Sequence, residues 1–326
     1  MREQCPMHGD KNCVIGHVAL MFQYTIRVKI IINSKQSEKM VMKTILPWQK
    51  KEQTAAEYLL HCYVIPAKKP TLPLKDEAFV SKWQKAEGSG VLNFLSDDLG
   101  LPAFAFHWED EDNLCIYFAQ TAGGNLPVIA TGTHEDFQTM EALLGGRQIK
   151  RELPLTVNAF TLEARAEKIF HHRILLLNRA PYSSIPAEAL GLSEEEWLKR
   201  SNRLRLAHEC AHYETLRLLG CMKNHALDEI LADTFGQIAA FGNFSAERQR
   251  LFFGLVQGED TCTGRLSFYT RNVRCEDRAE IYRTVDRVLD MIEAEIQEML
   301  SRKADDWEIL TSLAGQSIVE RLVGDR

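Results

Sequence analysis

Two histidines at helical spacing are the residues of this 326-residue chain best suited to chemistry. His208 and His212, in the stretch "HECAH", are four residues apart, so on a helix their side chains stand one turn apart on the same face. Two imidazoles in that arrangement can bind one zinc ion. Glu209 is rotated by about 100° around such a helix, and from there it can act as a general base on a water molecule at the metal.

A second group of acidic residues follows in the stretch "DEILAD". Glu229 and Asp233 are again four residues apart and therefore share a helical face. Glu229 can supply a third zinc ligand, and Asp233 can accept the other N–H of a ligand histidine and fix its orientation. Three protein ligands with one open position are typical of catalytic zinc. Asp228 is a competing third ligand, although it lies on a different helical face from Asp233.

These stretches resemble the active-site motif of the gluzincin metallopeptidases, in which a Glu ligand and an Asp four residues later follow HExxH on a second helix. The resemblance implies that His208, His212 and Glu229 bind Zn²⁺. It also implies that Glu209 is the catalytic base, that Asp233 supports a ligand histidine, and that the reaction is peptide-bond hydrolysis. The metzincin family does not fit, because "YETLRLLG" follows the second histidine and contains no further histidine.

The alternative to a metal site is a charged helix surface. Histidine and glutamate four residues apart often form exposed ion pairs worth a few tenths of a kcal/mol. The apolar residues around the motif instead predict a buried helix: Leu204, Leu206, Cys210, Ala211, Leu216 and Leu219. Burying this many ionisable groups without a cation would be costly. We therefore expect a zinc site.

A hydrolase of this type also needs a donor for the oxyanion that forms when a carbonyl is attacked. Tyr269, in "GRLSFYTRNV", is the preferred candidate because a phenol O–H suits this role, and Arg265 and Arg271 lie near it in the sequence. The alternative is that Tyr269 belongs to the core. Tyr282 is a further candidate, whereas Tyr213 should point away from the zinc face.

The helices that must position these residues are predicted from hydrophobic periodicity and capping signals. One helix should begin at Ser193, carry both histidines and end at Gly220. A second should run from near Asn224 to Phe241. A third, "EDRAEIYRTVDRVLDMIEAEIQEML", has apolar residues at helical spacing: Ile281, Val285, Leu289, Ile292 and Ile296.

Strands are predicted mainly in the earlier part of the chain. The short apolar runs "PAFAFHW", "LCIYFAQ" and "LPVIATG" are typical of strands, and a helix should begin at Thr133 and end at Gly145. "RILLLN", residues 173–178, predicts a further strand. It would be either an edge strand that pairs with an extended peptide substrate, as the gluzincin resemblance implies, or an interior strand.

These elements predict an α+β fold with a soft boundary near residue 150. We expect a poorly defined extension over residues 1–39, a mixed α/β domain over 40–150 and a mostly helical, zincin-like catalytic domain over 151–326. Cys5, His8, Cys13 and His17 in the extension could bind a second metal ion, although their order matches no familiar zinc motif.

Composition limits the classes of partner. The net charge is −6 and the 39 basic residues form no dense block, which argues against nucleic-acid binding. The apolar run over 18–33 is interrupted by Gln23, Arg27 and Lys29, so we expect no membrane span. The eight scattered cysteines favour reduced thiols and a cytoplasmic location.

The sequence thus predicts a zinc-dependent hydrolase, with a metallopeptidase acting on a peptide or protein as the preferred form. One alternative is a non-catalytic, zinc-stabilised helical binding module, which would have no use for Glu209. Another is a zinc hydrolase that acts on a non-peptide amide or ester, because the attack chemistry is shared.

Overall fold

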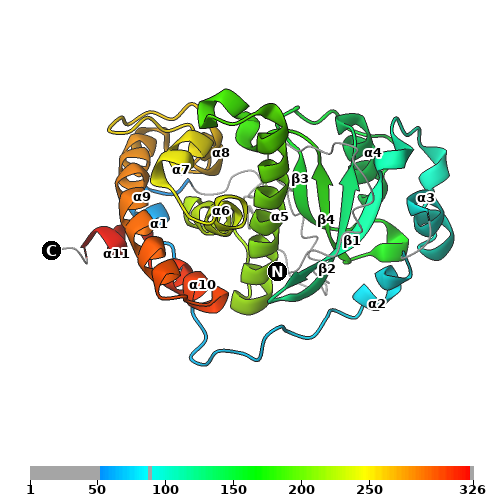
Figure 1. The fold of residues 1–326 in the computed structure, drawn as a ribbon, viewed down its shortest axis with the longest axis horizontal. Helices are drawn as coiled ribbons and strands as arrows, with labels where there is room; N and C mark the ends of the chain where they lie inside the picture. The colour runs from blue at the N-terminus through cyan, green and yellow to red at the C-terminus, as the bar shows by residue number, and fades with distance from the viewer. Residues whose placement is uncertain (1–51, 87–89, 324–326) are drawn as a thin grey trace, which may run out of the picture.

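The computed structural model describes residues 52–86 and 90–323, which form an α+β fold with a small mixed sheet beside a larger helical part (Figure 1). The strands are β1 (Cys115–Thr121), β2 (Gly124–Thr131), β3 (Ala159–Glu163) and β4 (Arg173–Asn178). The helices are α1 (Ala55–Leu59), α2 (Val80–Trp83), α3 (Val91–Asn93), α4 (His134–Leu144), α5 (Glu194–Leu219), α6 (Ala226–Phe241), α7 (Ala246–Phe253), α8 (Arg265–Tyr269), α9 (Arg278–Ser301), α10 (Asp306–Gly315) and α11 (Ile318–Val323). Among the described residues, no helix is long and apolar enough to cross a membrane.

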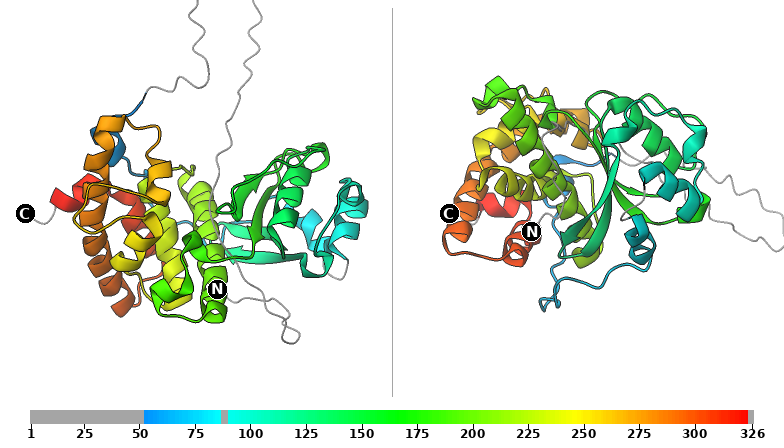
Figure 2. Two further views of the ribbon diagram at one scale, coloured as in Figure 1. Left: turned by 90° about the horizontal axis from the view of Figure 1, so that it is seen from above. Right: turned by 45° about the vertical axis from the view of Figure 1, so that its right-hand side comes forward.

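The sheet lies between α4 and α5, with the strand order β1-β2-β4-β3. β2 is antiparallel to β1 and parallel to β4, and β3 is antiparallel to β4. Successive side chains of a strand point to opposite faces. Leu176 of β4 accordingly packs in the cluster that contains Phe137 of α4, whereas Leu175 packs with Tyr213 of α5. Figure 2 shows α5 lying between the sheet and the helices that follow α5 in the chain.

The position of β4 decides between the two roles expected for residues 173–178. β4 lies between β2 and β3, and its last five residues are buried, so it is an interior strand. The edge-strand alternative is therefore wrong for this segment. The edge strands are β1 and β3, and the sequence did not predict β3.

The strand predicted for "PAFAFHW" is also wrong. Residues 103–105 form one turn of 3-10 helix, because the carbonyl of Ala103 accepts hydrogen bonds from the backbone N–H of Phe106 and from the indole of Trp108. Pro102, which has no N–H to give to a sheet, precedes this turn. The strands predicted in "LCIYFAQ" and "LPVIATG" are confirmed as β1 and β2.

The sheet takes two strands from each side of residue 150. The domain boundary expected near residue 150 therefore lies between strands that belong to one continuous sheet. The extension over residues 1–39 lies outside the described residues, as does the start of the expected 40–150 domain.

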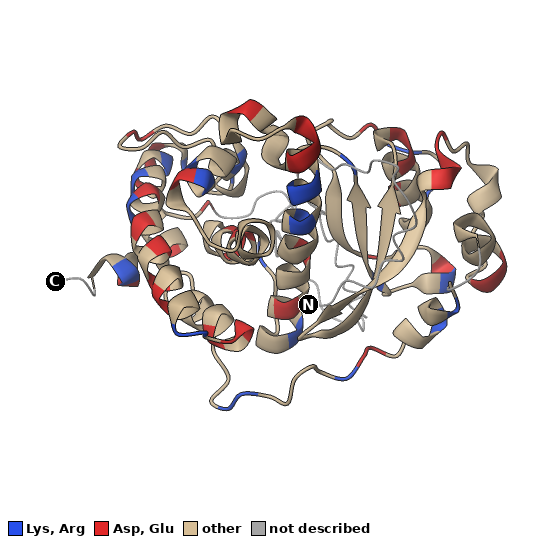
Figure 3. Cartoon of the chain, in the orientation of Figure 1, with Lys and Arg blue, Asp and Glu red and all other residues tan. Residues whose placement is uncertain are grey.

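The helical part is built around α6, which Figure 1 shows almost end-on, with α5, α7, α9 and α10 around it. The five apolar residues predicted to line one face of α9 are all fully buried: Ile281, Val285, Leu289, Ile292 and Ile296. The exposed side of the same helix is charged, with basic and acidic residues in its N-terminal half and acidic residues in its C-terminal half (Figure 3). This is the amphipathic pattern expected for a helix that covers a core.

The predicted ends of the two site helices are confirmed within two residues. Ser193 caps α5 by accepting the N–H of Glu196, and α5 ends at Gly220, which has φ 80°. α6 likewise ends at Gly242, which has φ 79°. Left-handed backbone of this kind suits glycine, which has no Cβ to clash.

α5 and α6 pack closely at Gly236. A Cβ on Gly236 would lie 2.8 Å from the carbonyl oxygen of Leu204, closer than real Cβ atoms approach backbone. Leu204 is one turn before His208, and Gly236 is close to one turn after Asp233. The absence of a side chain at Gly236 therefore sets the distance between the two helices next to the predicted site.

Candidate metal centre

The structure brings His208 and His212 of α5 together with Glu229 of α6. The Nε2 atoms of the two histidines are 3.1 Å apart. The carboxylate of Glu229 lies 3.7 Å from Nε2 of His208 through one oxygen and 3.5 Å from Nε2 of His212 through the other. All three side chains are nearly buried, with residue exposures of 4%, 8% and 2%.

These separations suit a tetrahedral zinc ion. Zinc bonds of 2.0–2.2 Å to imidazole nitrogen and carboxylate oxygen place neighbouring ligand atoms about 3.3–3.6 Å apart in a tetrahedron. The three distances, 3.1, 3.5 and 3.7 Å, lie around that range, with the two from Glu229 ending on different oxygens of its carboxylate. Small side-chain shifts would therefore be enough to bind an ion.

Among the described residues, the polar atoms of this cluster do not all have hydrogen-bond partners. Oε2 of Glu229 and Nδ1 of His212 have no hydrogen-bond partner among the residues that the structure describes. Burial raises the pKa of Glu229, and burial together with the neighbouring His208 lowers the pKa of His212 well below its usual range. Both shifts express the cost of holding these groups charged in a dry interior, and a cation would offset that cost.

Asp233 holds the ring of His208 through the nitrogen that faces away from His212 and Glu229. Its Oδ1 lies 2.8 Å from Nδ1 of His208, so this nitrogen carries the proton and Nε2 presents its lone pair to the centre. Asp233 also accepts hydrogen bonds from Tyr182, Arg265 and Gln249, the last at 2.6 Å. Burial alone would raise the pKa of Asp233, but Arg265 and His208 hold it well below its usual range. The carboxylate is therefore charged at neutral pH.

Glu209 faces an edge strand of the sheet. Thr161 of β3 donates its hydroxyl to Oε2 of Glu209 at 2.6 Å. Thr161 can do so because it alternates with Phe160 and Leu162, which point to the α4 side of the sheet. Glu209 is thus held between β3 and the part of α5 that carries His208 and His212.

Arg205 lies one turn before Glu209 and is an unusual neighbour. It is fully buried, and within residues 52–86 and 90–323 none of its guanidinium nitrogens has a hydrogen-bond partner. Burial lowers the pKa of Arg205 to about 9, while Tyr182 and Glu209 raise it. The chain therefore keeps a positive charge near the candidate base.

The tyrosines considered from the sequence fall in three different places. Burial and the neighbouring carboxylate of Glu229 raise the pKa of Tyr269 well above its usual range, so this residue lies at the centre. Tyr282 lies 3.0 Å from the hydroxyl of Thr270 and belongs to the core of the helical part. Tyr213 faces the sheet, away from the ligands, as expected.

Asp228, the competing ligand, is not part of this centre. Its carboxylate groups instead with His61 and His225, a separate cluster of potential ligands. The possible N-terminal site of Cys5, His8, Cys13 and His17 lies outside the described residues.

Several residues of the centre were not identified from the sequence as supporting groups: Tyr182, Thr161, Gln249 and Arg265. The strand that contains Thr161 could have been predicted, because "AFTLE" alternates apolar and polar residues as a strand does. Tyr182 carried none, since it lies in an irregular loop and reaches His208 only through tertiary packing.

Residues 155–323 match the model of a family of unknown function (DUF7005), and this match covers just over half of the 326-residue chain. The chain belongs to this family. The matched residues of this chain include β3, β4 and every helix from α5 to α11. They therefore contain all residues of the candidate metal centre. No curated protein and no solved structure matches the chain.

Proposed function

We propose that this DUF7005 protein is a zinc-dependent hydrolase, with a metallopeptidase as the preferred form. The observation that carries the proposal is the convergence of His208, His212 and Glu229 at distances suited to zinc, with Asp233 fixing one ligand ring. Glu229, rather than Asp228, is the third ligand in this proposal because its carboxylate lies between both histidines.

The residues around the centre have complementary tasks in this proposal. Zinc would supply Lewis acidity, which polarises a carbonyl and lowers the pKa of a nearby water molecule. Glu209 accepts the proton of that water and later passes it to the leaving amine. Tyr269, which lies against Glu229, donates its O–H to the oxyanion. Asp233 keeps the ring of His208 in one tautomer throughout.

A peptide substrate is favoured by the edge strand β3. Thr161 of β3 reaches Glu209 directly, so this strand runs beside the proposed base. In the described ranges, β3 pairs only with β4, which leaves its other edge available for an extended peptide. Pairing of that kind gives affinity through main-chain hydrogen bonds.

One observation favours the non-catalytic alternative. The three ligand side chains are almost completely buried, and one oxygen of Glu209 is already bound by Thr161. A zinc ion that only stabilises the helix pair would have the same surroundings. The two functions differ in what happens when Glu209 loses its ability to accept a proton.

The first experiment is elemental analysis of the purified full chain after zinc is offered. His208→Ala should lose one zinc equivalent relative to wild type. The matched control is His107→Ala, because His107 is exposed and lies outside both clusters of potential ligands. Equal zinc content in His208→Ala and His107→Ala would remove the metal centre and with it the proposed function.

The second experiment separates catalysis from structure. Glu209→Gln should retain the zinc but hydrolyse a peptide library about 10²–10⁴-fold more slowly, because general-base catalysis contributes a factor of that size. Small amide and ester substrates are tested in parallel, and selective turnover of these would replace the peptidase by the non-peptide hydrolase. Absence of turnover in wild type that holds zinc would favour the non-catalytic module.

A further inference from the structure

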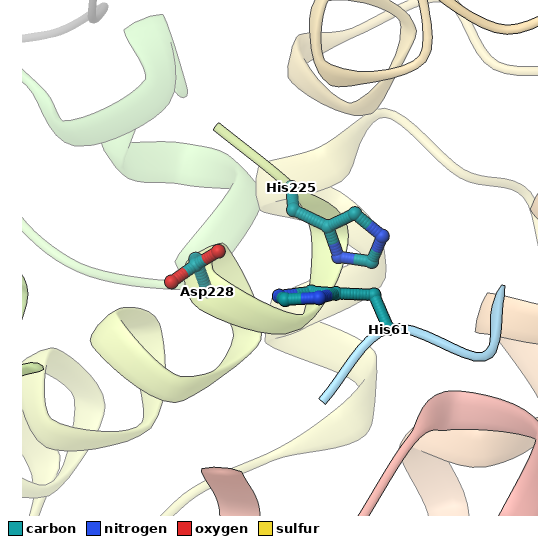
Figure 4. A group of neighbouring side chains, drawn as sticks. All are labelled: His61, His225 and Asp228. Carbon is teal, nitrogen blue, oxygen red and sulfur yellow. The ribbon is translucent and has the colours of Figure 1, made fainter. Parts of the chain in front are cut away.

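A second cluster of potential ligands lies at the N-terminal end of α6. His225 is the residue that caps this helix, Asp228 is in its first turn, and His61 follows α1. One ligand atom from each residue lies within 4.8 Å of the other two. Figure 4 shows the His61 ring extending toward Asp228, with the His225 ring beside it.

Asp228 is the residue that most needs a partner here. It is fully buried, and neither of its carboxylate oxygens has a partner with full hydrogen-bond geometry in the part of the chain that the structure describes. The backbone N–H of Lys223 only partly opposes the rise in the carboxyl pKa that burial and Glu229 cause. The Nε2 atom of His61 is likewise buried and unpartnered within the same described residues. Buried polar groups are normally paired with protein, water or an ion. Two unpaired groups facing one another therefore indicate a missing third partner.

The hydrogen bonds of His225 fix its tautomer. Its Nε2 lies 2.8 Å from the carbonyl oxygen of Tyr58, so this nitrogen carries the proton. Its Nδ1 accepts the N–H of Leu227 at 3.1 Å and therefore holds the lone pair. The ring is neutral, which is the form that binds metal, and in Figure 4 a nitrogen of the ring faces His61 and Asp228. Metal binding at Nδ1 would replace the hydrogen bond from Leu227.

Lys223 is the group that opposes a cation at this position. Its ammonium lies 3.1 Å from Nδ1 of His61. Lys223 is exposed, so its side chain can turn into solvent when Nδ1 becomes protonated and Nε2 becomes the ligand. The charge of Lys223 should therefore weaken metal binding without preventing it.

We propose that His61, His225 and Asp228 form a second metal site, which takes zinc or a similar borderline divalent cation. Two imidazoles and one carboxylate are the donor set that such ions prefer. The ion would join the segment after α1 to the first turn of α6, the turn that also carries Glu229. The two sites share no ligand, so this inference does not depend on the proposed hydrolase.

The test counts zinc in the full chain. Cys5→Ser and Cys13→Ser are built into every variant, so that the N-terminal cysteines cannot hold an ion. This parent should bind two zinc ions, and His61→Gln and Asp228→Asn should each bind one. His208→Ala should also bind one, and His61→Gln combined with His208→Ala should bind none. Retention of the parent's zinc content by both His61→Gln and Asp228→Asn would overturn the second site.

The outcomes for the two sites are distinguishable. Loss of zinc in His61→Gln but not in His208→Ala would support the second site while removing the proposed hydrolase centre. His61 is partly exposed and lies outside any helix, so His61→Gln should keep the wild-type circular dichroism spectrum.

Lys223→Gln supplies a readout that a purely structural histidine cluster would not change. In the His208→Ala background it should tighten zinc binding roughly tenfold, because a positive charge next to the ion is removed. Unchanged or weaker binding would count against the site.

Discussion

The ion pair between Asp233 and Arg265 predicts a large loss of stability when its negative partner is removed. Both side chains are buried, with exposures of 0% and 3%. Asp233→Asn keeps the size of the side chain but leaves the charged guanidinium of Arg265 in the interior without the carboxylate of its ion pair, although it still donates to the hydroxyl of Tyr182. Breaking a buried pair in this way costs about 3–5 kcal/mol. The metal-free protein should therefore lose about that much unfolding free energy.

The assay is urea unfolding in the presence of a chelator, which removes any contribution from bound metal. A matched control is Asp260→Asn, because Asp260 pairs with Arg283 on the surface, where both side chains are more than half exposed. That change should cost less than about 1 kcal/mol. Combining Asp233→Asn with Arg265→Met should cost less than the sum of the single changes, by about 2 kcal/mol.

Two results would refute this reasoning. One is an equal loss in Asp233→Asn and Asp260→Asn, and the other is strict additivity of Asp233→Asn with Arg265→Met. Zinc affinity gives a separate readout. Asp233→Asn should weaken it by about ten- to a hundredfold, because Asp233 orients the ring of His208. Arg265→Met should weaken it less, since the contact with His208 remains.

Three further changes test other parts of the structure. Gly236→Ala should lower the melting temperature and the zinc affinity together, because its Cβ would press on the backbone of Leu204; normal values would show that the helices are not in close contact. Tyr269→Phe should keep the zinc but lower kcat by about 10²–10³-fold, as for loss of one oxyanion donor. An unchanged kcat would mean that the Tyr269 hydroxyl interacts with Glu229 and takes no part in the reaction. Burial raises the pKa of Glu214 to about 7, so its contribution to stability is complete below pH 4.5 and is lost as the pH rises through 7. Glu214→Gln should therefore gain on the order of 2–3 kcal/mol relative to wild type between pH 5 and pH 8 in denaturant unfolding; a difference that does not change with pH would contradict this.

Helical periodicity alone was enough to predict which residues of the candidate centre share a helical face. His208 and His212 share a face because 3.6 residues make one turn, and the same rule joins Glu229 to Asp233. The distances of 3.1 Å between the imidazoles and 2.8 Å from His208 to Asp233 agree with that expectation. The ends of both helices were also predictable, since Ser, Gly and the apolar pattern act locally.

The roles of the strands were harder to predict. Residues 173–178 form a strand, as the run of branched apolar residues indicates, but local pattern does not say whether a strand lies inside a sheet or at its edge. That depends on which other strands pair with it. β3 took an edge position and brought Thr161 to Glu209, although the two residues are 48 positions apart.

Local patterns were enough to predict the α+β class, the two site helices and the residues that could bind zinc, because each depends on neighbours within a few turns of the chain. The groups that surround these residues come together only through long-range packing. Tyr182 and Arg265 meet at Asp233, and His61 meets Asp228, from segments separated by 32 residues or more. Such contacts result from how helices and loops pack into one core, and spacing along the chain does not encode that packing in any local pattern.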